Sequence, residues 1–200
     1  MSKPTVDYFF APQSPWTYLG HPRFAQLVTS QDLHLRIKPV DLGKVFAVSG
    51  GLPLSQRPAQ RRAYRLVELE RFGRALGMTI HLQPKFFPVA GDPAARLIIA
   101  VDAARGPLAD MQLCGAIFAA VWAQERDIAN PTVLADLLQE QNLPASCLDA
   151  AQSPSVQARY DTYTQEAIDA GVFGAPTYMV NGEMFWGQDR LDFVAQALMR

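Results

Sequence analysis

The chain has 200 residues, of which 49% are hydrophobic and 18% charged, and its formal net charge is -1. This composition is typical of a globular protein that buries its core without metal or disulfide cross-links, and it excludes a disordered chain. The balanced charge, with no run of five or more Lys/Arg residues, argues against nucleic acid as a partner.

Nothing in the sequence predicts export or contact with a membrane. The first residues show no basic segment followed by an apolar one, and no apolar stretch reaches the roughly 18 residues that a spanning helix needs. Cys114 and Cys147 form neither a C-x-x-C pair nor a metal-type spacing, so we expect no metal site. We therefore expect a cytoplasmic protein in which both cysteines are free thiols.

The first forty residues predict a strand, a helix and a second strand. Residues 5–10 are β-branched and aromatic, as in a short strand. Ser14 and Pro15 are a favoured cap and first residue for a helix that continues to about residue 30. Residues 33–38 alternate apolar and polar side chains, which indicates a half-buried strand. A helical crossover between two strands indicates parallel pairing.

The middle of the chain predicts helices. Residues 41–58 are rich in glycine and proline and are interpreted as a loop. The densest basic stretch, residues 57–65, is interpreted as the solvated face of a helix. The expected helical segments are 59–76 (with Gly77 as C-cap), 93–105, 108–123, 132–142, a short turn at 145–151, and 155–170.

The last thirty residues predict a hairpin and a final helix. Two short strands, 177–180 and 183–186, flank Asn181-Gly182, which is the strongest two-residue hairpin signal. Asp189 is a candidate N-cap for a helix over residues 190–199.

Joining the two ends of the chain predicts an α/β fold, in which a thioredoxin-like mixed sheet carries a large α-helical insertion. We expect residues 1–42 and 155–200 to form the thioredoxin-like domain. Residues 43–154 would form the inserted helical domain and cover the sheet.

Three places in this arrangement carry candidate chemistry. Ser14 starts a helix, where free N–H groups and the helix dipole stabilise a thiolate, although it could serve only as a cap. The Ala175-Pro176 bond, if cis, would leave the backbone of Ala175 open to an extended, peptide-like ligand, whereas a trans proline would only begin a strand. Residues 186–190 offer N–H groups at another helix start, or simply a capped helix.

Together these places resemble a known family. The matching segments are Tyr8-Phe9-Phe10, Ser14-Pro15-Trp16-Thr17-Tyr18-Leu19, Val172-Phe173-Gly174-Ala175-Pro176-Thr177 and Phe185-Trp186-Gly187-Gln188-Asp189-Arg190-Leu191. In order and spacing they are similar to the 2-hydroxychromene-2-carboxylate isomerases, which belong to the kappa-class glutathione transferase and DsbA-like branch of the thioredoxin fold.

The resemblance implies a cofactor and residues that hold it. Glutathione would be the cofactor, and Ser14 would be the catalytic residue that activates its sulfur. Ala175, before a cis Pro176, would pair with the cysteinyl part. The γ-glutamyl end would be held by Trp186, Gly187, Gln188 and Asp189. A homodimer is also expected from the family alone.

The resemblance further implies an aromatic carboxylate as substrate, bound between the sheet and the insertion. Gln56 and Arg57 match the polar-Arg pair that contacts substrate in the family, and Arg57 would pair with the carboxylate. Phe87 would wall an apolar pocket. The sequence departs from the family at Gln56, where Asn is usual, and at Phe46, where some members have a lysine that Lys44 would replace.

The expected reaction is glutathione-dependent cis-trans isomerisation of 2-hydroxychromene-2-carboxylate or a similar unsaturated aromatic keto acid in the breakdown of aromatic compounds. The thiol would add to a conjugated carbon, let the former double bond rotate, and leave again. A kappa-like glutathione transferase with another electrophile and a non-catalytic glutathione-binding protein remain alternatives. A thiol oxidoreductase is disfavoured because residues 14–17 contain no dithiol.

Overall fold

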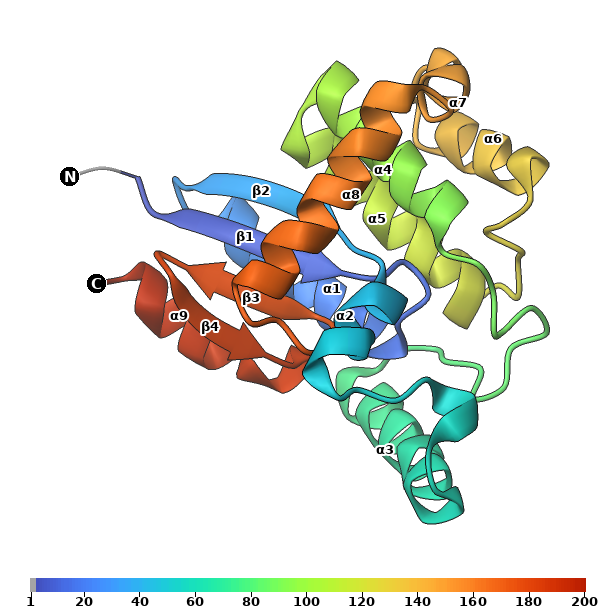
Figure 1. Ribbon diagram of the computed structural model, residues 1–200, viewed down its shortest axis with the longest axis vertical. Coiled ribbons are helices and arrows are strands. Elements are labelled where there is room, and N and C mark those ends of the chain that lie inside the picture. Colours follow the sequence, from blue (N-terminus) through green and yellow to red (C-terminus); the bar gives the residue numbers. More distant parts are fainter. Residues whose placement is uncertain (1–2) are drawn as a thin grey trace.

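A mixed four-stranded sheet joins the two ends of the chain in the computed structural model, which describes residues 3–200 (Figure 1). Its strands are β1 (Thr5–Phe10), β2 (His34–Pro39), β3 (Thr177–Val180) and β4 (Glu183–Trp186), in the order β2-β1-β3-β4. β1 and β2 are parallel, whereas β3 is antiparallel to both β1 and β4. The sheet confirms the expected thioredoxin-like fold.

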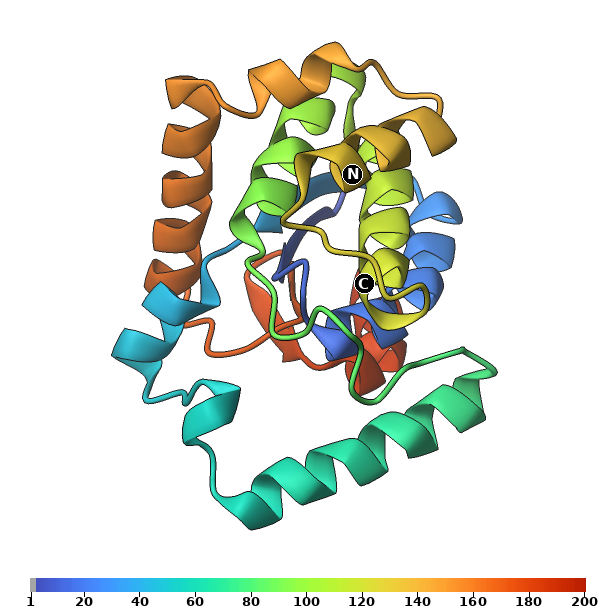
Figure 2. The same cartoon turned by 90° about the vertical axis from the view of Figure 1, so that its right-hand side faces the viewer.

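Helices fill the space between and around these strands. α1 (Pro15–Thr29) connects β1 to β2, and α9 (Leu191–Leu198) closes the chain. Figure 2 shows α3 (Ala59–Leu76) lying along one end of the molecule, separate from the helices that cover the sheet. The others are α2 (Leu42–Ser49), the 3₁₀ turn η1 (Leu54–Gln56), α3 (Ala59–Leu76), α4 (Asp92–Arg105), α5 (Pro107–Trp122), α6 (Pro131–Glu140), α7 (Ser146–Ala150) and α8 (Pro154–Asp169).

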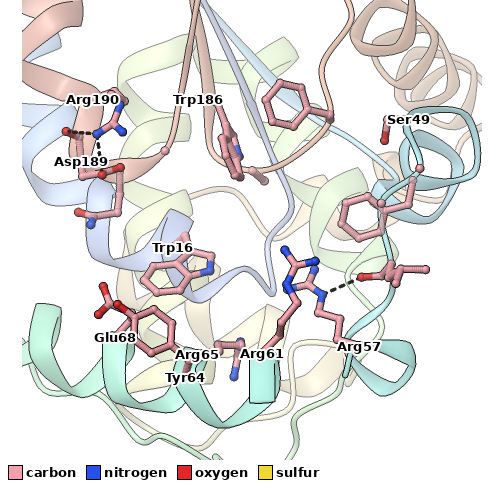
Figure 3. Close-up of a pocket in the computed structure, with 18 of the residues that line it drawn as sticks. Trp16, Ser49, Arg57, Arg61, Tyr64, Arg65, Glu68, Trp186, Asp189 and Arg190 are labelled. Atoms are coloured by element: carbon pink, nitrogen blue, oxygen red, sulfur yellow. Dashed lines mark hydrogen bonds and ion pairs between the residues drawn. The ribbon is translucent and has the colours of Figure 1, made fainter. Parts of the chain in front are cut away.

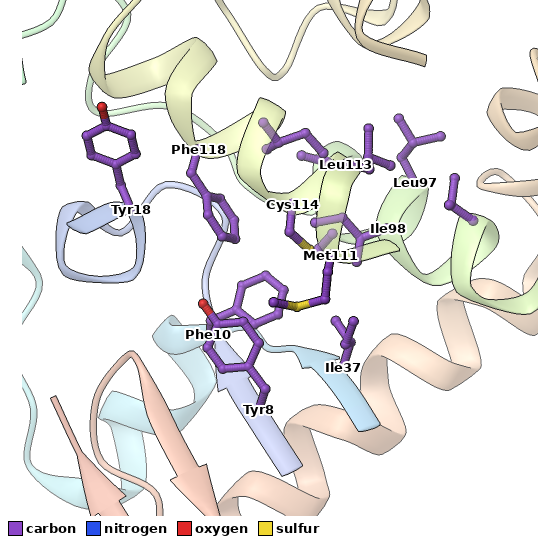
Figure 4. Packing of buried hydrophobic residues seen from close by; sticks show 14 of the residues in the cluster. Tyr8, Phe10, Tyr18, Ile37, Leu97, Ile98, Met111, Leu113, Cys114 and Phe118 are labelled. Atoms are coloured by element: carbon purple, nitrogen blue, oxygen red, sulfur yellow. The ribbon is translucent and has the colours of Figure 1, made fainter. Parts of the chain in front are cut away.

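Alternation along β1 places its side chains in two separate apolar clusters. Val6, Tyr8 and Phe10 enter the large core, which α1, α4 and α5 complete (Figure 4). Phe9 enters a smaller cluster on the opposite face, with residues of α2 and α8. Tyr8 stacks on Tyr178 of β3, with ring centroids 5.3 Å apart and planes 2° from parallel. The central strands are therefore buried on both faces.

The helical insertion shares its core with the sheet. Leu97 and Ile98 of α4 and Leu113 and Phe118 of α5 belong to the same buried cluster as Tyr8 and Ile37. Figure 4 shows the two helices packed directly over β1 and β2. The division into residues 1–42 with 155–200 and residues 43–154 stays a proposal about the chain's organisation, because one apolar core spans both parts.

The interpretation of residues 41–58 as a loop was wrong over α2 and the turn η1. Asp41 caps α2, since its carboxylate accepts hydrogen bonds from the N–H groups of Gly43 at 2.8 Å and Lys44 at 3.3 Å. Gly50 ends the helix in the left-handed conformation, with φ 74°. Asp and Gly in these positions are ordinary start and stop signals, but the proline and glycine content outweighed them in the interpretation.

The C-terminal hairpin is confirmed, but the final helix begins later than expected. Asn181 (φ 49°) and Gly182 (φ 91°) both have positive φ, as a tight two-residue hairpin turn requires. Asp189 does not cap α9. A 3₁₀ turn, Gln188–Arg190, precedes the helix, and the Asp189 carboxylate pairs with Arg190 at 2.7 Å instead.

No helix in the described part of the chain is both long enough and apolar enough to cross a bilayer.

A buried carboxyl group lies near the start of α5. Asp110 is fully buried, and neither of its carboxyl oxygens has a hydrogen-bond partner among residues 3–200. Burial first, and then the charge of Asp102, raise the pKa of Asp110 well above its ordinary value. The folded protein therefore keeps a proton that the unfolded chain releases near pH ~4.

We predict that Asp110→Asn removes a loss of stability at rising pH. One retained proton lowers the wild-type free energy of unfolding by about 1.4 kcal/mol per pH unit above about pH 4, until the folded carboxyl ionises. The advantage of the variant should grow with that slope in urea unfolding between about pH 4 and 7. Asp192→Asn, at an exposed position of α9, is the control and should show no such trend. A pH-independent difference for Asp110→Asn would contradict the interpretation.

Candidate functional site

Strand pairing brings the two ends of the chain together where β1 and β4 end and β3 begins. This end of the sheet is called the sheet edge below. Phe9, near the end of β1, lies opposite Thr177, the first residue of β3. Thr177 also lies opposite Trp186, the last residue of β4. The segments that follow β1, precede β3 and follow β4 therefore meet at this edge. They contain Ser14, the 175–176 peptide bond and residues 187–190, respectively.

Ser14 is the N-cap of α1, and its side chain is largely buried. Its hydroxyl oxygen accepts a hydrogen bond from the N–H of Thr17 at 3.3 Å. The hydroxyl proton remains available to donate, because a hydroxyl both donates and accepts. Ser14 is 8% exposed and does not itself line the cavity described below, although Trp16, in the first turn of the same helix, does.

The peptide bond between Ala175 and Pro176 is cis, as the sequence interpretation required. Ala175 is half-buried and lines the cavity. Its N–H and C=O have no hydrogen-bond partner in the described part of the chain, whereas the C=O of Pro176 accepts from the N–H of Gly187 at 2.9 Å. An unpaired donor and acceptor on one residue match the edge of an extended peptide.

Trp186 forms an aromatic lip beside this peptide bond. It is 51% exposed and packs against Phe173, with ring centroids 4.8 Å apart. A Cβ atom at Gly174 would lie 2.4 Å from the indole Nε1, so the absence of a side chain at residue 174 lets the indole lie against the backbone. The lip is thus built from both segments that flank the β3–β4 hairpin.

Gln188 and Asp189 follow Trp186, and their side chains differ in availability. Gln188 is 2% exposed, and both its side-chain and backbone carbonyl oxygens accept hydrogen bonds from Arg23. Its side-chain oxygen is therefore already engaged. Asp189 is exposed and pairs with its neighbour Arg190, so its carboxylate faces solvent at the cavity.

A cavity of about 890 Å³ opens between this edge and α3 (Figure 3). Its walls are largely aromatic and cationic, and they come from four parts of the chain. Lining residues are Trp16 from α1; Phe46, Ser49, Gly50, Gly51 and Leu52 from α2 and the loop after it; Arg57, Gln60, Arg61, Tyr64, Arg65, Glu68 and Phe72 from α3 and its approach; and Phe173, Ala175, Trp186, Gly187, Gln188, Asp189 and Arg190 from the C-terminal segments.

Arginine side chains dominate the charge of the α3 wall. Arg57 donates from Nε to the C=O of Leu52 at 2.8 Å. Its pKa is lowered by burial first and then by the charge of Arg61. Burial and the charge of Arg57 lower the pKa of Arg65 to about 10. A guanidinium group is a cation in proteins, so this wall is cationic.

Several residues predicted to contact substrate lie outside the cavity wall. Lys44 is exposed and pairs with Asp161 of α8 at 2.9 Å, and that hydrogen bond raises its pKa. Gln56, at the end of η1, is exposed and does not line the cavity. Phe87 packs on Trp122, with ring centroids 4.8 Å apart, behind the wall. Of the predicted substrate residues, only Arg57 lines the cavity.

The sequence interpretation missed Arg61 and Arg65 as cavity residues. It treated the basic stretch 57–65 as a solvated helix face, yet Arg57 and Arg65 are half-buried and all three arginines line the cavity. The available signal was the four-residue spacing of Arg61 and Arg65, which puts them on one side of α3, with Arg57 just before the helix. Arg62, one position off this spacing, is exposed and outside the wall.

Comparisons with known proteins agree with this architecture. A family model described as a DSBA-like thioredoxin domain matches residues 5–199. A relative named 2-hydroxychromene-2-carboxylate isomerase, from Pseudomonas putida, is 28% identical over 98% of this chain and 94% of its own length. One named glutathione S-transferase kappa 1, from Homo sapiens, is 23% identical over 97% and 90%. A solved 2-hydroxychromene-2-carboxylate isomerase structure has a TM-score of 0.78 and 26% identity, over 98% of this chain and 95% of that one.

We predict that Gly174→Ala displaces the Trp186 lip. The new methyl group would overlap the rigid indole, and overpacking of this kind costs about 1–3 kcal/mol. The variant should unfold at lower urea concentration and show a changed tryptophan fluorescence spectrum.

The matched test uses Trp186→Phe, which removes the indole nitrogen that the methyl group would meet. In that background Gly174→Ala should cost much less stability. Equal losses in both backgrounds would mean that the cost of the methyl group does not come from the indole of Trp186.

Proposed function

The chain belongs to the DSBA-like thioredoxin domain family, and on that premise we propose that it is a glutathione-dependent isomerase. Its substrate would be 2-hydroxychromene-2-carboxylate or a similar unsaturated aromatic keto acid. The observation that carries the proposal is a serine, rather than a cysteine, at the start of α1, with a cis Ala175-Pro176 bond at the same edge of the sheet.

The cysteines of this chain lie away from that edge. Cys114 is fully buried in α5, and Cys147 is buried in α7. Neither lines the cavity. Burial, followed by the charges of Asp110 and Asp102, raises the pKa of Cys114 well above its usual value, which disfavours its reactive thiolate form. A reactive sulfur at this site would have to come from a bound molecule.

The residues present fit glutathione. The unpaired N–H and C=O of Ala175 suit the backbone of its cysteinyl unit. Beyond the cis peptide, Trp186, Gly187 and Asp189 line the same cavity, and the Asp189 carboxylate suits the γ-glutamyl ammonium group. Gln188 would act through its backbone or its amide nitrogen, because Arg23 already binds its side-chain oxygen.

When bound, glutathione supplies a thiol that adds to a conjugated carbon of the substrate and leaves again unchanged. Ser14 would donate its hydroxyl proton in a hydrogen bond to the sulfur while still accepting from Thr17. The N-terminus of α1 would favour negative charge at that position. Arg57 would hold the substrate carboxylate, and Trp16, Phe46 and Phe72 would enclose the aromatic ring.

Two alternatives share the same site. A kappa-like glutathione transferase would join glutathione to another electrophile, and a relative of that name matches nearly the whole chain. A non-catalytic protein would bind glutathione without turnover. A homodimer and a cytoplasmic location stay predictions from the sequence.

Measuring product and total thiol in the same reaction tests the proposal against both alternatives. With 2-hydroxychromene-2-carboxylate in large excess over glutathione, we predict many turnovers per glutathione molecule and no loss of total thiol. The product is followed by absorbance, and the thiol is titrated before and after. Loss of one thiol per product would instead show a transferase, and calorimetric binding without product would show a binding protein.

We predict that Ser14→Ala lowers turnover at least about tenfold. A hydrogen bond to a charged group is worth about 1.5–3 kcal/mol, and each ~1.4 kcal/mol is a factor of ten in rate. Loss of the cap itself should cost only about 1 kcal/mol of stability, so the variant should remain folded by circular dichroism.

Ser153→Ala is the matched control for Ser14→Ala. Ser153 also precedes a proline, caps α8 by accepting from the N–H of Val156 at 3.4 Å, and does not line the cavity. Its replacement should cause a similar loss of stability and leave turnover unchanged. An equal effect of the two variants on turnover would reduce Ser14 to a helix cap.

A further inference from the structure

Three arginines on one side of α3 and its approach line the cavity at four-residue intervals. Arg57 precedes the helix, and Arg61 and Arg65 follow one and two turns later. Figure 3 shows Arg57 and Arg61 extending from the α3 side toward the wall that carries Trp186. Arg65 lies over the rings of Phe87 and Trp122, with its guanidinium carbon 5.4 Å and 5.6 Å from their centroids.

These arginines differ from their neighbours in having no carboxylate partner. Arg71 and Arg74, further along α3, pair with Glu68 and Glu70. Arg190, across the cavity, pairs with Asp189. In the described part of the chain, no carboxylate lies within ion-pair distance of Arg57, Arg61 or Arg65.

The cavity therefore carries three positive charges that no lining residue balances. Glu68, also in the wall, is already paired with Arg71, whose side chain lies outside it. A nearby like charge disfavours the charged form of an arginine, and partial burial adds a desolvation cost. The lowered pKa values of Arg57 and Arg65 have these two causes. An anionic ligand would offset both costs.

A single carboxylate engages one guanidinium in the usual two-pronged geometry. In the proposed function that group is Arg57, and the substrate in the relatives' name, 2-hydroxychromene-2-carboxylate, carries one carboxylate. Arg61 and Arg65 then have no anionic partner in that substrate. Glutathione carries two carboxylates of its own, so a subsite for a second carboxylate of the acid must be measured with glutathione already bound.

We propose that Arg61 and Arg65 form a second anion subsite, so that the preferred ligand is an aromatic acid with a second carboxylate. The inference rests on the proposed function only in assigning the first carboxylate to Arg57. Arg61 is the outer and more exposed of the pair, and it contacts the second carboxylate directly. Arg65, stacked on Phe87 and Trp122, provides the inner charge.

Binding of simple aromatic acids tests the subsite without turnover. The probes are benzoate, with one carboxylate, and phthalate, isophthalate and terephthalate, with two in different geometries. Isothermal titration calorimetry of the wild-type protein saturated with glutathione should give at least one dicarboxylate a Kd tenfold or more below that of benzoate. The advantage should shrink as salt is added, because salt screens exposed charges.

Arg61→Gln should abolish this advantage and leave the Kd of benzoate within about twofold. Arg61→Lys should retain part of the dicarboxylate advantage, because the positive charge remains but the two-pronged hydrogen-bonding geometry of the guanidinium group is lost. Arg62→Gln is the matched control, because Arg62 is the next residue on the same helix yet is exposed and outside the wall. Arg65 is not used, because its replacement would also remove packing against Trp122.

Three outcomes would overturn the subsite. They are equal affinity for benzoate and every dicarboxylate, a parallel loss for both classes in Arg61→Gln, and a loss confined to glutathione affinity. Failure of the proposed function looks different. A protein that prefers dicarboxylates through Arg61 but turns over no chromene carboxylate would retain the subsite and lose the isomerase assignment.

Discussion

The site depends on the antiparallel pairing of β1 with β3. Because Phe9 lies opposite Thr177, the start of α1 and the cis Ala175-Pro176 bond reach the same edge of the sheet. Tyr8 stacked on Tyr178 holds this register inside the core. If β3 slipped by one residue along β1, Tyr178 would turn to the other face of the sheet and the peptide bond would shift relative to Ser14. The geometry offered to a ligand is therefore set by packing beneath the sheet, and no contact between Ser14 and Ala175 is needed to maintain it.

The two sides of the cavity have different physical characters. The sheet edge offers backbone polar groups, a hydroxyl at a helix start and an exposed indole, which suit a peptide-like molecule. The α3 side offers unpaired guanidinium groups and aromatic rings, which suit an aromatic anion. α3 lies at one end of the molecule (Figure 2), and it joins the large core through the fully buried Leu69.

The sequence indicated the sheet-edge half of the site more accurately than the α3 half. Ser14, the cis proline and residues 186–189 belong to short local patterns, and the segments that contain them meet as expected. Lys44, Gln56 and Phe87 were candidate substrate residues, but Lys44 pairs with Asp161 and Phe87 packs on Trp122. The directions of the Lys44 and Phe87 side chains depend on how α2 and the loop before α4 pack against the rest of the protein. No local sequence pattern marks this packing. Arg61 and Arg65 were missed because a basic stretch on a helix is normally solvated.

By itself, the sequence determined the order of the strands and of every α-helix except α2, most helix ends, the hairpin at Asn181-Gly182 and the absence of a dithiol at the first helix. These features rest on interactions within a few residues, such as caps, turn conformations and alternating side chains. Only the tertiary structure decided which arginines face the cavity, that Gln188 is held by Arg23, and that the inserted helices share the core of the sheet. Each of these depends on contacts between segments far apart in the chain, and a single sequence carries no local record of such contacts.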